Sequence, residues 1–207
     1  MEELKIKKFV LGKMSTNCYL IENDNHSIII DPGDQANQLI DYLIQNNLKL
    51  EAILLTHAHF DHIGAIDQLV EKYNCSVYVH QNDYNMIYDD YLNLSNYYNA
   101  LKIKSKVNAI NDYIDIDHFH FEFVNLPGHT AGSCFIFLKK YHIIFSGDVL
   151  FKNSIGRFDF PTSSSSDTRK SMVKIQKIDE DYKIYPGHGE STTLFQEKQS
   201  NPYLQVE

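Results

Sequence analysis

The stretch THAHFDH, residues 56–62, places three histidines and an aspartate within seven residues. It directly follows the apolar run AILL, residues 52–55, which has the length and composition of a buried strand. Behind it, apolar residues recur at helical spacing at Ile63, Ile66, Leu69, Val70 and Tyr73. The sequence therefore predicts a strand, a connecting loop that carries the histidines, and then a helix.

The rest of the chain shows the same alternation of strands and helices. We expect strands within residues 5–11, 17–23, 27–33, 51–56, 76–80, 118–127, 133–140, 142–149 and 183–188, the first two joined as a hairpin. We expect helices at 35–47, 63–73 and 167–178, the last with Asp167 as its N-cap. The Tyr- and Asn-rich segment 81–104 has irregular helical spacing, which predicts short helices, and a lid that faces the substrate is one use for it.

Size and composition indicate a globular protein. With 207 residues and 43% hydrophobic content, we expect a single domain over residues 1–207. Neither a run of 18 apolar residues nor the uninterrupted apolar core of a signal peptide occurs, so we expect a cytoplasmic protein without a membrane partner. The net charge of -8 disfavours nucleic-acid binding and favours a small-molecule substrate. The oligomeric state is left open.

The three cysteines, Cys18, Cys75 and Cys134, are odd in number and lie in apolar contexts. This pattern favours buried, reduced thiols over a disulfide framework or a thiolate metal site.

Three further strand ends carry a residue of the metal-ligand type beside a glycine. They are His129 in LPGHTAGS, Asp148 in FSGDV and His188 in YPGHGE, and each glycine permits a tight turn that aims the side chain. Imidazole nitrogens and carboxylate oxygens suit zinc-like cations, and iron or manganese also fit them. The candidate ligands suffice for two divalent metal ions with open positions: His57, His59, Asp61, His62, His129, Asp148 and His188.

The order T-H-A-H-F-D-H, P-G-H-T, S-G-D and G-H-G resembles the metallo-β-lactamase superfamily. The resemblance covers essentially the whole chain and implies an α/β fold, a four-layer αββα sandwich. It also implies that His57, His59 and His129 hold a first metal. The second would be held by Asp61, His62 and His188, with Asp148 bridging both.

Two positions favour one branch of this superfamily. Its true lactamases typically carry a cysteine in place of Asp148 and lack the histidine at His62, so the chain resembles the glyoxalase II branch rather than an antibiotic-degrading enzyme. SIGRFDFP, residues 154–161, resembles an element of short glyoxalase II-like proteins and of the related persulfide dioxygenases. Arg157 and Asp159 of this element would either help to shape the site or form a salt-linked loop brace, and we expect the brace. Full-length glyoxalase II has a further C-terminal helical region that holds glutathione, so glutathione specificity is not implied.

These observations predict a binuclear metal-dependent hydrolase of thioesters, with Asp61 and Asp148 as its catalytic residues. Two metals about 3.5 to 4 Å apart lower the pKa of a shared water toward about 7, and the resulting hydroxide would attack the thioester carbonyl. Asp61 would orient this nucleophile. Thr56 and Thr130 flank ligands and are expected to orient them or to cap their loops.

Other interpretations stay open. They are a mononuclear iron enzyme like the persulfide dioxygenases, a metal-dependent nuclease, and a binding module without catalysis. Alternation in HFHFEF places His118, His120 and Glu122 on one strand face, which we interpret as solvated. His80 ends a strand, and no motif places it in the site.

Overall fold

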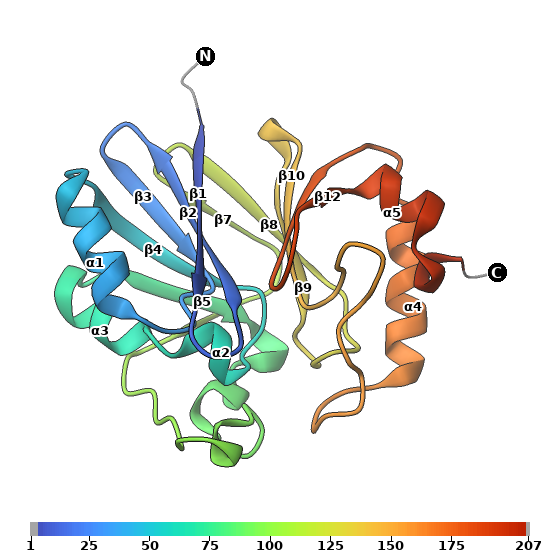
Figure 1. Cartoon of the computed structure of the whole chain (residues 1–207), viewed down its shortest axis with the longest axis horizontal. Coiled ribbons are helices and arrows are strands. Elements are labelled where there is room, and N and C mark those ends of the chain that lie inside the picture. Colours follow the sequence, from blue (N-terminus) through green and yellow to red (C-terminus); the bar gives the residue numbers. More distant parts are fainter. Residues whose placement is uncertain (1–3, 206–207) are drawn as a thin grey trace.

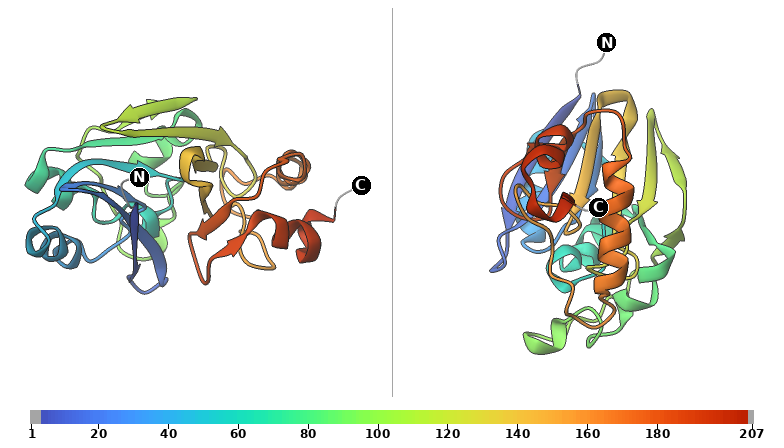
Figure 2. Two further views of the ribbon diagram at one scale, coloured as in Figure 1. Left: turned by 90° about the horizontal axis from the view of Figure 1, so that it is seen from above. Right: turned by 90° about the vertical axis from the view of Figure 1, so that its right-hand side faces the viewer.

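The computed structural model describes residues 4–205 and shows two six-stranded sheets packed face to face (Figure 1, Figure 2). The first sheet has the order β1-β2-β3-β4-β5-β6, formed by Lys5–Leu11, Thr16–Asn23, His26–Ile30, Lys49–Leu55, Ser76–His80 and Asn108–Ile110. The second has the order β12-β11-β10-β9-β8-β7. Its strands from β7 to β12 are Tyr113–Ile116, Phe119–Asn125, Cys134–Leu138, Ile143–Gly147, Lys183–Pro186 and Thr192–Thr193.

Helices cover both outer faces and complete four layers. Helices α1 (Ala36–Gln45) and α3 (Ile66–Tyr73) pack on the first sheet through Leu39, Leu43 and Leu69. On the second sheet, α4 (Ser165–Gln176) and α5 (Leu194–Ser200) bury Met172, Ile175 and Leu194. The predicted αββα sandwich is therefore confirmed, with α1 and α3 on one side of Figure 1 and α4 and α5 on the other.

The core between the sheets follows the two-residue period of strands. Ile28 and Ile30 of β3 face Phe119, Phe121 and Phe123 of β8, while Ile29 points to the helices of its own side. Burying each such side chain contributes about 1.5–3 kcal/mol. Because both faces of β3 are covered, its apolar run SIII is continuous rather than alternating.

Strand direction brings the predicted ligand positions to one edge. Strands β3, β4 and β5 are parallel neighbours, and so are β10 and β11. Parallel strands place their carboxyl ends on the same side of a sheet. The loops that follow β3, β4, β10 and β11 therefore gather at one end of the sandwich, which is where the candidate ligands lie.

Two helix boundaries differ from expectation. The helix predicted at 63–73 starts only at Ile66, as α3, and Ile63 instead ends a separate short helix, α2 (Phe60–Ile63). Between the two helices, the Ala65 amide donates to the Pro32 carbonyl at 2.9 Å and so does not continue the hydrogen bonding of α2. Helix α4 starts earlier than predicted, and its N-cap is Ser164, whose Oγ accepts from the Asp167 amide at 3.2 Å. Asp167 is therefore a first-turn residue, and its assignment as N-cap was wrong.

Strands β6, β7 and β12 and helix α5 were not predicted. The segment 81–104 forms three short 3₁₀ turns, Gln81–Asp83, Asn85–Tyr88 and Ser95–Tyr97, in agreement with the expected short helices. All three cysteines are free and buried, as expected. Within residues 4–205, no helix has the length and apolar character needed to cross a membrane.

Candidate metal centre

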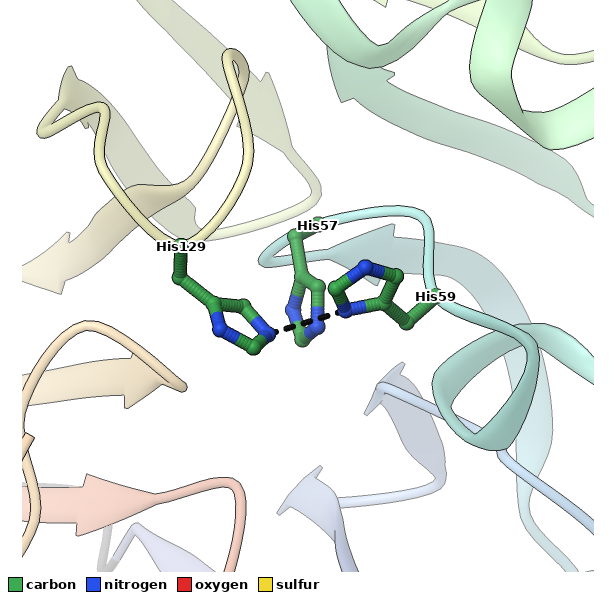
Figure 3. A group of neighbouring side chains, drawn as sticks. All are labelled: His57, His59 and His129. Carbon is green, nitrogen blue, oxygen red and sulfur yellow. Dashed lines mark hydrogen bonds between the residues drawn. The ribbon is translucent and has the colours of Figure 1, made fainter. Parts of the chain in front are cut away.

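Three histidines from two loops form the first group of the cluster. His57 and His59 lie in the loop after β4, and His129 lies in the loop after β8 (Figure 3). One ligand-type atom of each lies within 4.8 Å of the others. The dashed line in Figure 3 joins His59 Nδ1 to His129 Nε2 at 2.9 Å. All three side chains are buried.

Asp61 and His62 of α2 form a second group with His188, which follows β11. Their ligand-type atoms also lie within 4.8 Å of one another. Asp61 Oδ2 is 3.6 Å from His62 Nε2 and 3.4 Å from His188 Nε2. The structure thus brings together the three residues that the resemblance implied for a second metal.

Asp148, at the end of β10, lies between the two groups. Its Oδ2 is 3.5 Å from His129 Nε2 of the first group and 3.5 Å from His188 Nε2 of the second. Its Oδ1 is 3.5 Å from His62 Nε2. A single carboxylate therefore faces both groups, and all seven predicted residues lie in one cluster.

Several atoms of this cluster lack the partner that a buried polar atom normally has. Within residues 4–205, these side-chain atoms have no hydrogen-bond partner: His57 Nε2, His59 Nε2, His62 Nε2 and Asp148 Oδ1. Unpaired imidazole nitrogens beside a carboxylate are the donor set that zinc, iron and manganese accept. The residues present therefore fit divalent metal ions.

Hydrogen bonds behind the ligands fix their orientation. Nδ1 of His57 donates to Thr56 Oγ1 at 3.1 Å, and Nδ1 of His129 donates to the Arg157 carbonyl at 2.7 Å. The Thr16 hydroxyl donates to Asp61 Oδ2 at 2.8 Å. Such partners hold the Nε2 lone pairs toward the cluster. The expected orienting role of Thr56 agrees with this geometry.

Asp31, for which the sequence predicted no role in the site, supports the site from behind. Its Oδ2 accepts from His62 Nδ1 at 3.0 Å and from the Thr56 hydroxyl at 2.6 Å, and its Oδ1 accepts from the Thr56 amide. Asp31, His57 and His62 also form a third ligand-type group, but these hydrogen bonds occupy the carboxylate. The sequence contained one signal for this role. Asp31 directly follows the buried run SIII, just as the candidate ligand Asp148 follows a buried strand.

Burial and charge divide the histidines into two classes. Burial lowers the pKa of His57, His59 and His129 below the usual value, so these imidazoles are neutral. Burial also opposes charge on His62 and His188, but nearby carboxylates outweigh it and raise the pKa of His62 to about 9 and that of His188 to about 10. A bound cation would replace these protons, as metal binding to histidine does in general.

Both carboxylates of the cluster are ionised. Burial favours the neutral acid in each, but His62 and His188 outweigh it and lower the pKa of Asp61 and of Asp148. Ionised carboxylates and neutral imidazoles are the forms that ligate metals.

A cleft of about 650 Å³ opens above the cluster. Its floor includes His59, Asp61, His129, Asp148 and His188. Its walls come from the turn after β1, from α2, from the segment 81–104 and from residues 151–161. A small molecule in this cleft therefore has direct access to both groups of the cluster.

The remaining sequence-based interpretations can be placed. Arg157 and Asp159 form a bidentate pair with two N···O distances of 2.9 Å, as the loop-brace prediction required, and both line the cleft. The Thr130 hydroxyl donates to buried Asp83 at 2.7 Å, which agrees with a loop-holding role. Nδ1 of His80 accepts from the Asn82 amide, and His80 does not line the cleft.

The strand face of His118, His120 and Glu122 is solvated as predicted. His118 and His120 are exposed, and His120 pairs with Asp115 at 2.7 Å.

A family model for the metallo-beta-lactamase superfamily matches residues 11–188. The chain belongs to this superfamily. Curated relatives include the Bacillus subtilis protein named Probable metallo-hydrolase YqgX, which is 34% identical, with 97% of this chain and 98% of the relative covered. The hydroxyacylglutathione hydrolase GloC of Haemophilus influenzae is 33% identical, with 91% and 92% covered. The protein is thus a metallo-hydrolase of the metallo-β-lactamase superfamily.

Solved structures of this superfamily agree with the fold. The BLEG-1 B3 metallo-beta-lactamase has a TM-score of 0.91 and 36% identity, with 97% of this chain and 100% of that chain covered. TTHA1623 in a di-iron-bound form has a TM-score of 0.86 and 33% identity, with 95% and 99% covered. Because one neighbour carries a β-lactamase name, the expected distinction from antibiotic-degrading enzymes stays a prediction.

Proposed function

We propose that this metallo-β-lactamase superfamily protein hydrolyses small-molecule thioesters such as hydroxyacylglutathione. Its cluster would hold two divalent metal ions, with Zn²⁺ as the first candidate and iron or manganese as alternatives. His57, His59 and His129 would hold one ion, and Asp61, His62 and His188 the other. The observation that carries the proposal is the position of Asp148, whose Oδ2 faces both groups at 3.5 Å.

Two such ions, when bound, lower the pKa of a water molecule and polarise a carbonyl oxygen. The chain's own residues supply orientation. Asp61 lines the cleft while Thr16 holds its Oδ2, so this carboxylate can orient a water beside a bound carbonyl. Asp31 and the Arg157 carbonyl keep His62 and His129 aimed at the same point.

The thioester part of the proposal is supported by GloC, a relative that spans 91% of this chain and is named a hydroxyacylglutathione hydrolase. The di-iron form of TTHA1623 supports a two-metal site and leaves the metal open between zinc and iron. The test is elemental analysis of protein purified without added metal, paired with hydrolysis of S-lactoylglutathione by the same sample. One iron per chain without hydrolysis would contradict the proposal and favour the mononuclear dioxygenase.

The first prediction concerns Asp148. Asp148→Ala removes the carboxylate that faces both groups, so we expect turnover to fall by at least about 10³-fold and the metal content to fall below two ions per chain. Turnover and elemental content are measured on protein whose circular dichroism matches the wild type. Near wild-type turnover by a folded variant would contradict the assignment of Asp148.

A β-lactam is the second candidate substrate, because BLEG-1 is 36% identical and carries a β-lactamase name. Hydrolysis of nitrocefin by the same metal-loaded sample tests it. A kcat/KM for nitrocefin above that for S-lactoylglutathione would favour this second activity over the first.

A further inference from the structure

One side of the cleft is built from apolar and aromatic side chains, most of which are exposed. We define the aromatic wall as Met14, Phe60, Tyr97 and Tyr98, all of which line the cleft. Tyr97 is 66% exposed, Tyr98 59% and Met14 43%. Large apolar side chains that gather at one exposed site indicate a surface that binds something. Because this wall rises from the metal cluster, a substrate on the cluster is the occupant that it fits.

Contacts within the wall place it beside the reacting position. The rings of Phe60 and Tyr98 have centroids 4.7 Å apart and an interplanar angle of 31°. The Tyr98 hydroxyl lies 3.9 Å from Met14 Sδ. Phe60 immediately precedes Asp61, so the wall begins next to a residue of the cluster. A group attached to a carbonyl near Asp61 would therefore contact these rings.

The loop that presents Tyr97 and Tyr98 is fixed by hydrogen bonds. The Phe60 amide donates to the Asn93 carbonyl at 2.9 Å, and Asn93 Oδ1 accepts from the Ser95 amide at 2.9 Å. Ser95 Oγ in turn accepts from the Leu101 amide at 2.9 Å. A preformed wall can bind a rigid group without the cost of ordering the loop.

In the part of the chain that the structure describes, the cleft has no free lysine or arginine in its lining that could pair with an anionic group. Among the described residues that line it, Arg157 is the only lysine or arginine, and Asp159 engages it through two bonds of 2.9 Å. Its guanidinium also lies 4.4 Å from the centroid of the Phe160 ring. The guanidinium charge is thus already paired, and the described residues of the wall offer an anionic group no positively charged partner.

We propose that the aromatic wall binds an uncharged aromatic group attached to the reacting carbonyl, with Tyr98 as the specificity-determining residue. The inference rests on the proposed thioester hydrolysis and adds the class of acyl group. The protein is expected to hydrolyse thioesters with aromatic acyl groups better than those with small or anionic ones.

S-mandeloylglutathione and S-lactoylglutathione test this preference, because they differ only by a phenyl in place of a methyl group. We expect kcat/KM to be about tenfold higher for the mandeloyl ester, and lowest for S-malylglutathione, in which a carboxylate replaces one hydrogen of the lactoyl methyl group. Tyr98→Ala should remove most of the mandeloyl to lactoyl ratio, and Tyr98→Phe should keep it. The matched control is Tyr91→Ala, because Tyr91 is 52% exposed in the same segment and does not line the cleft.

Non-hydrolysable thioethers separate this inference from the proposed activity. S-(2-hydroxy-2-phenylethyl)glutathione and S-(2-hydroxypropyl)glutathione match the two esters without the carbonyl, and calorimetry gives their Kd values. Tighter binding of the phenyl compound, weakened by Tyr98→Ala, supports the binding role of the aromatic wall. This holds even if neither ester is hydrolysed, because the lack of hydrolysis would contradict only the proposed thioesterase activity. The inference would be overturned if the two thioethers had equal Kd values and the two esters equal kcat/KM values. It would also be overturned if Tyr98→Ala and Tyr91→Ala changed the mandeloyl to lactoyl ratio of kcat/KM equally.

Discussion

Asp83 is a fully buried carboxylate that joins the two histidine loops of the site. It accepts from the Ala58 amide, between His57 and His59, at 3.1 Å. It also accepts from the Thr130 hydroxyl at 2.7 Å and from the Gly132 amide at 2.6 Å. Burial outweighs these three donors and raises its pKa to about 6.

This raised pKa makes the free energy of unfolding depend on pH. The folded state keeps the Asp83 proton up to about pH 6, whereas the unfolded chain releases it near pH 4, so the contribution of this group falls as the pH rises between these values. Asp83→Asn removes the titration. We define the gap as the free energy of unfolding of the wild type minus that of the variant. As the pH rises across this interval, we expect this gap to fall by up to about 1.4 kcal/mol per pH unit.

Urea unfolding of both proteins at pH 4.5 and pH 7 measures this gap. A gap that is the same at pH 4.5 and pH 7 would show that Asp83 is ionised throughout in the folded state and would contradict the prediction.

At the scale of elements, the start of α4 is coupled to the site. The Ser164 side chain caps this helix by accepting from the Asp167 amide at 3.2 Å, and the Ser164 amide donates to the Gly128 carbonyl, next to His129. We expect Ser164→Ala to lower the free energy of unfolding by about 1 kcal/mol, measured by urea unfolding. Ser164→Asp, which keeps a capping oxygen, should lose less. A larger loss from Asp167→Ala than from Ser164→Ala would contradict this cap.

At the scale of the whole molecule, the cluster joins the two sheets. His57, His59, Asp61 and His62 follow β4 of the first sheet, whereas Asp148 and His188 follow β10 and β11 of the second. Metal ions held by residues from both sheets would stabilise the folded state and not the unfolded chain. We expect chelation to lower the midpoint of thermal unfolding by about 5–10 °C.

Differential scanning fluorimetry with and without EDTA measures the shift, and restored Zn²⁺ should reverse it. EDTA that has been saturated with Zn²⁺ beforehand is the control that should change nothing, because it cannot remove metal from the protein. An unchanged midpoint after complete metal removal would contradict a cluster that holds the sheets together through its ligands.

The sequence by itself determined the positions of the candidate ligands and most of the strands and helices that form the sandwich. THAHFDH, His129, Asp148 and His188 each carry a local motif at a strand end, and the apolar runs beside them have the periods of strands and helices. Each motif and the apolar run beside it span only a few residues, so they can be recognised in the sequence before the fold is known. The strands β6, β7 and β12 were missed because they are only two to four residues long and carry little period.

Only the tertiary structure decided the features that join distant segments. The hydrogen bond from the Ala65 amide to the Pro32 carbonyl separates α2 from α3. Asp31 and Asp83 support the site through hydrogen bonds to partners 25 to 49 residues away. The aromatic wall likewise combines Met14 with Tyr98, 84 residues apart. Local periodicity reports which face of an element is apolar, but it does not report which other segment will meet that face. These contacts follow from the packing of the whole chain.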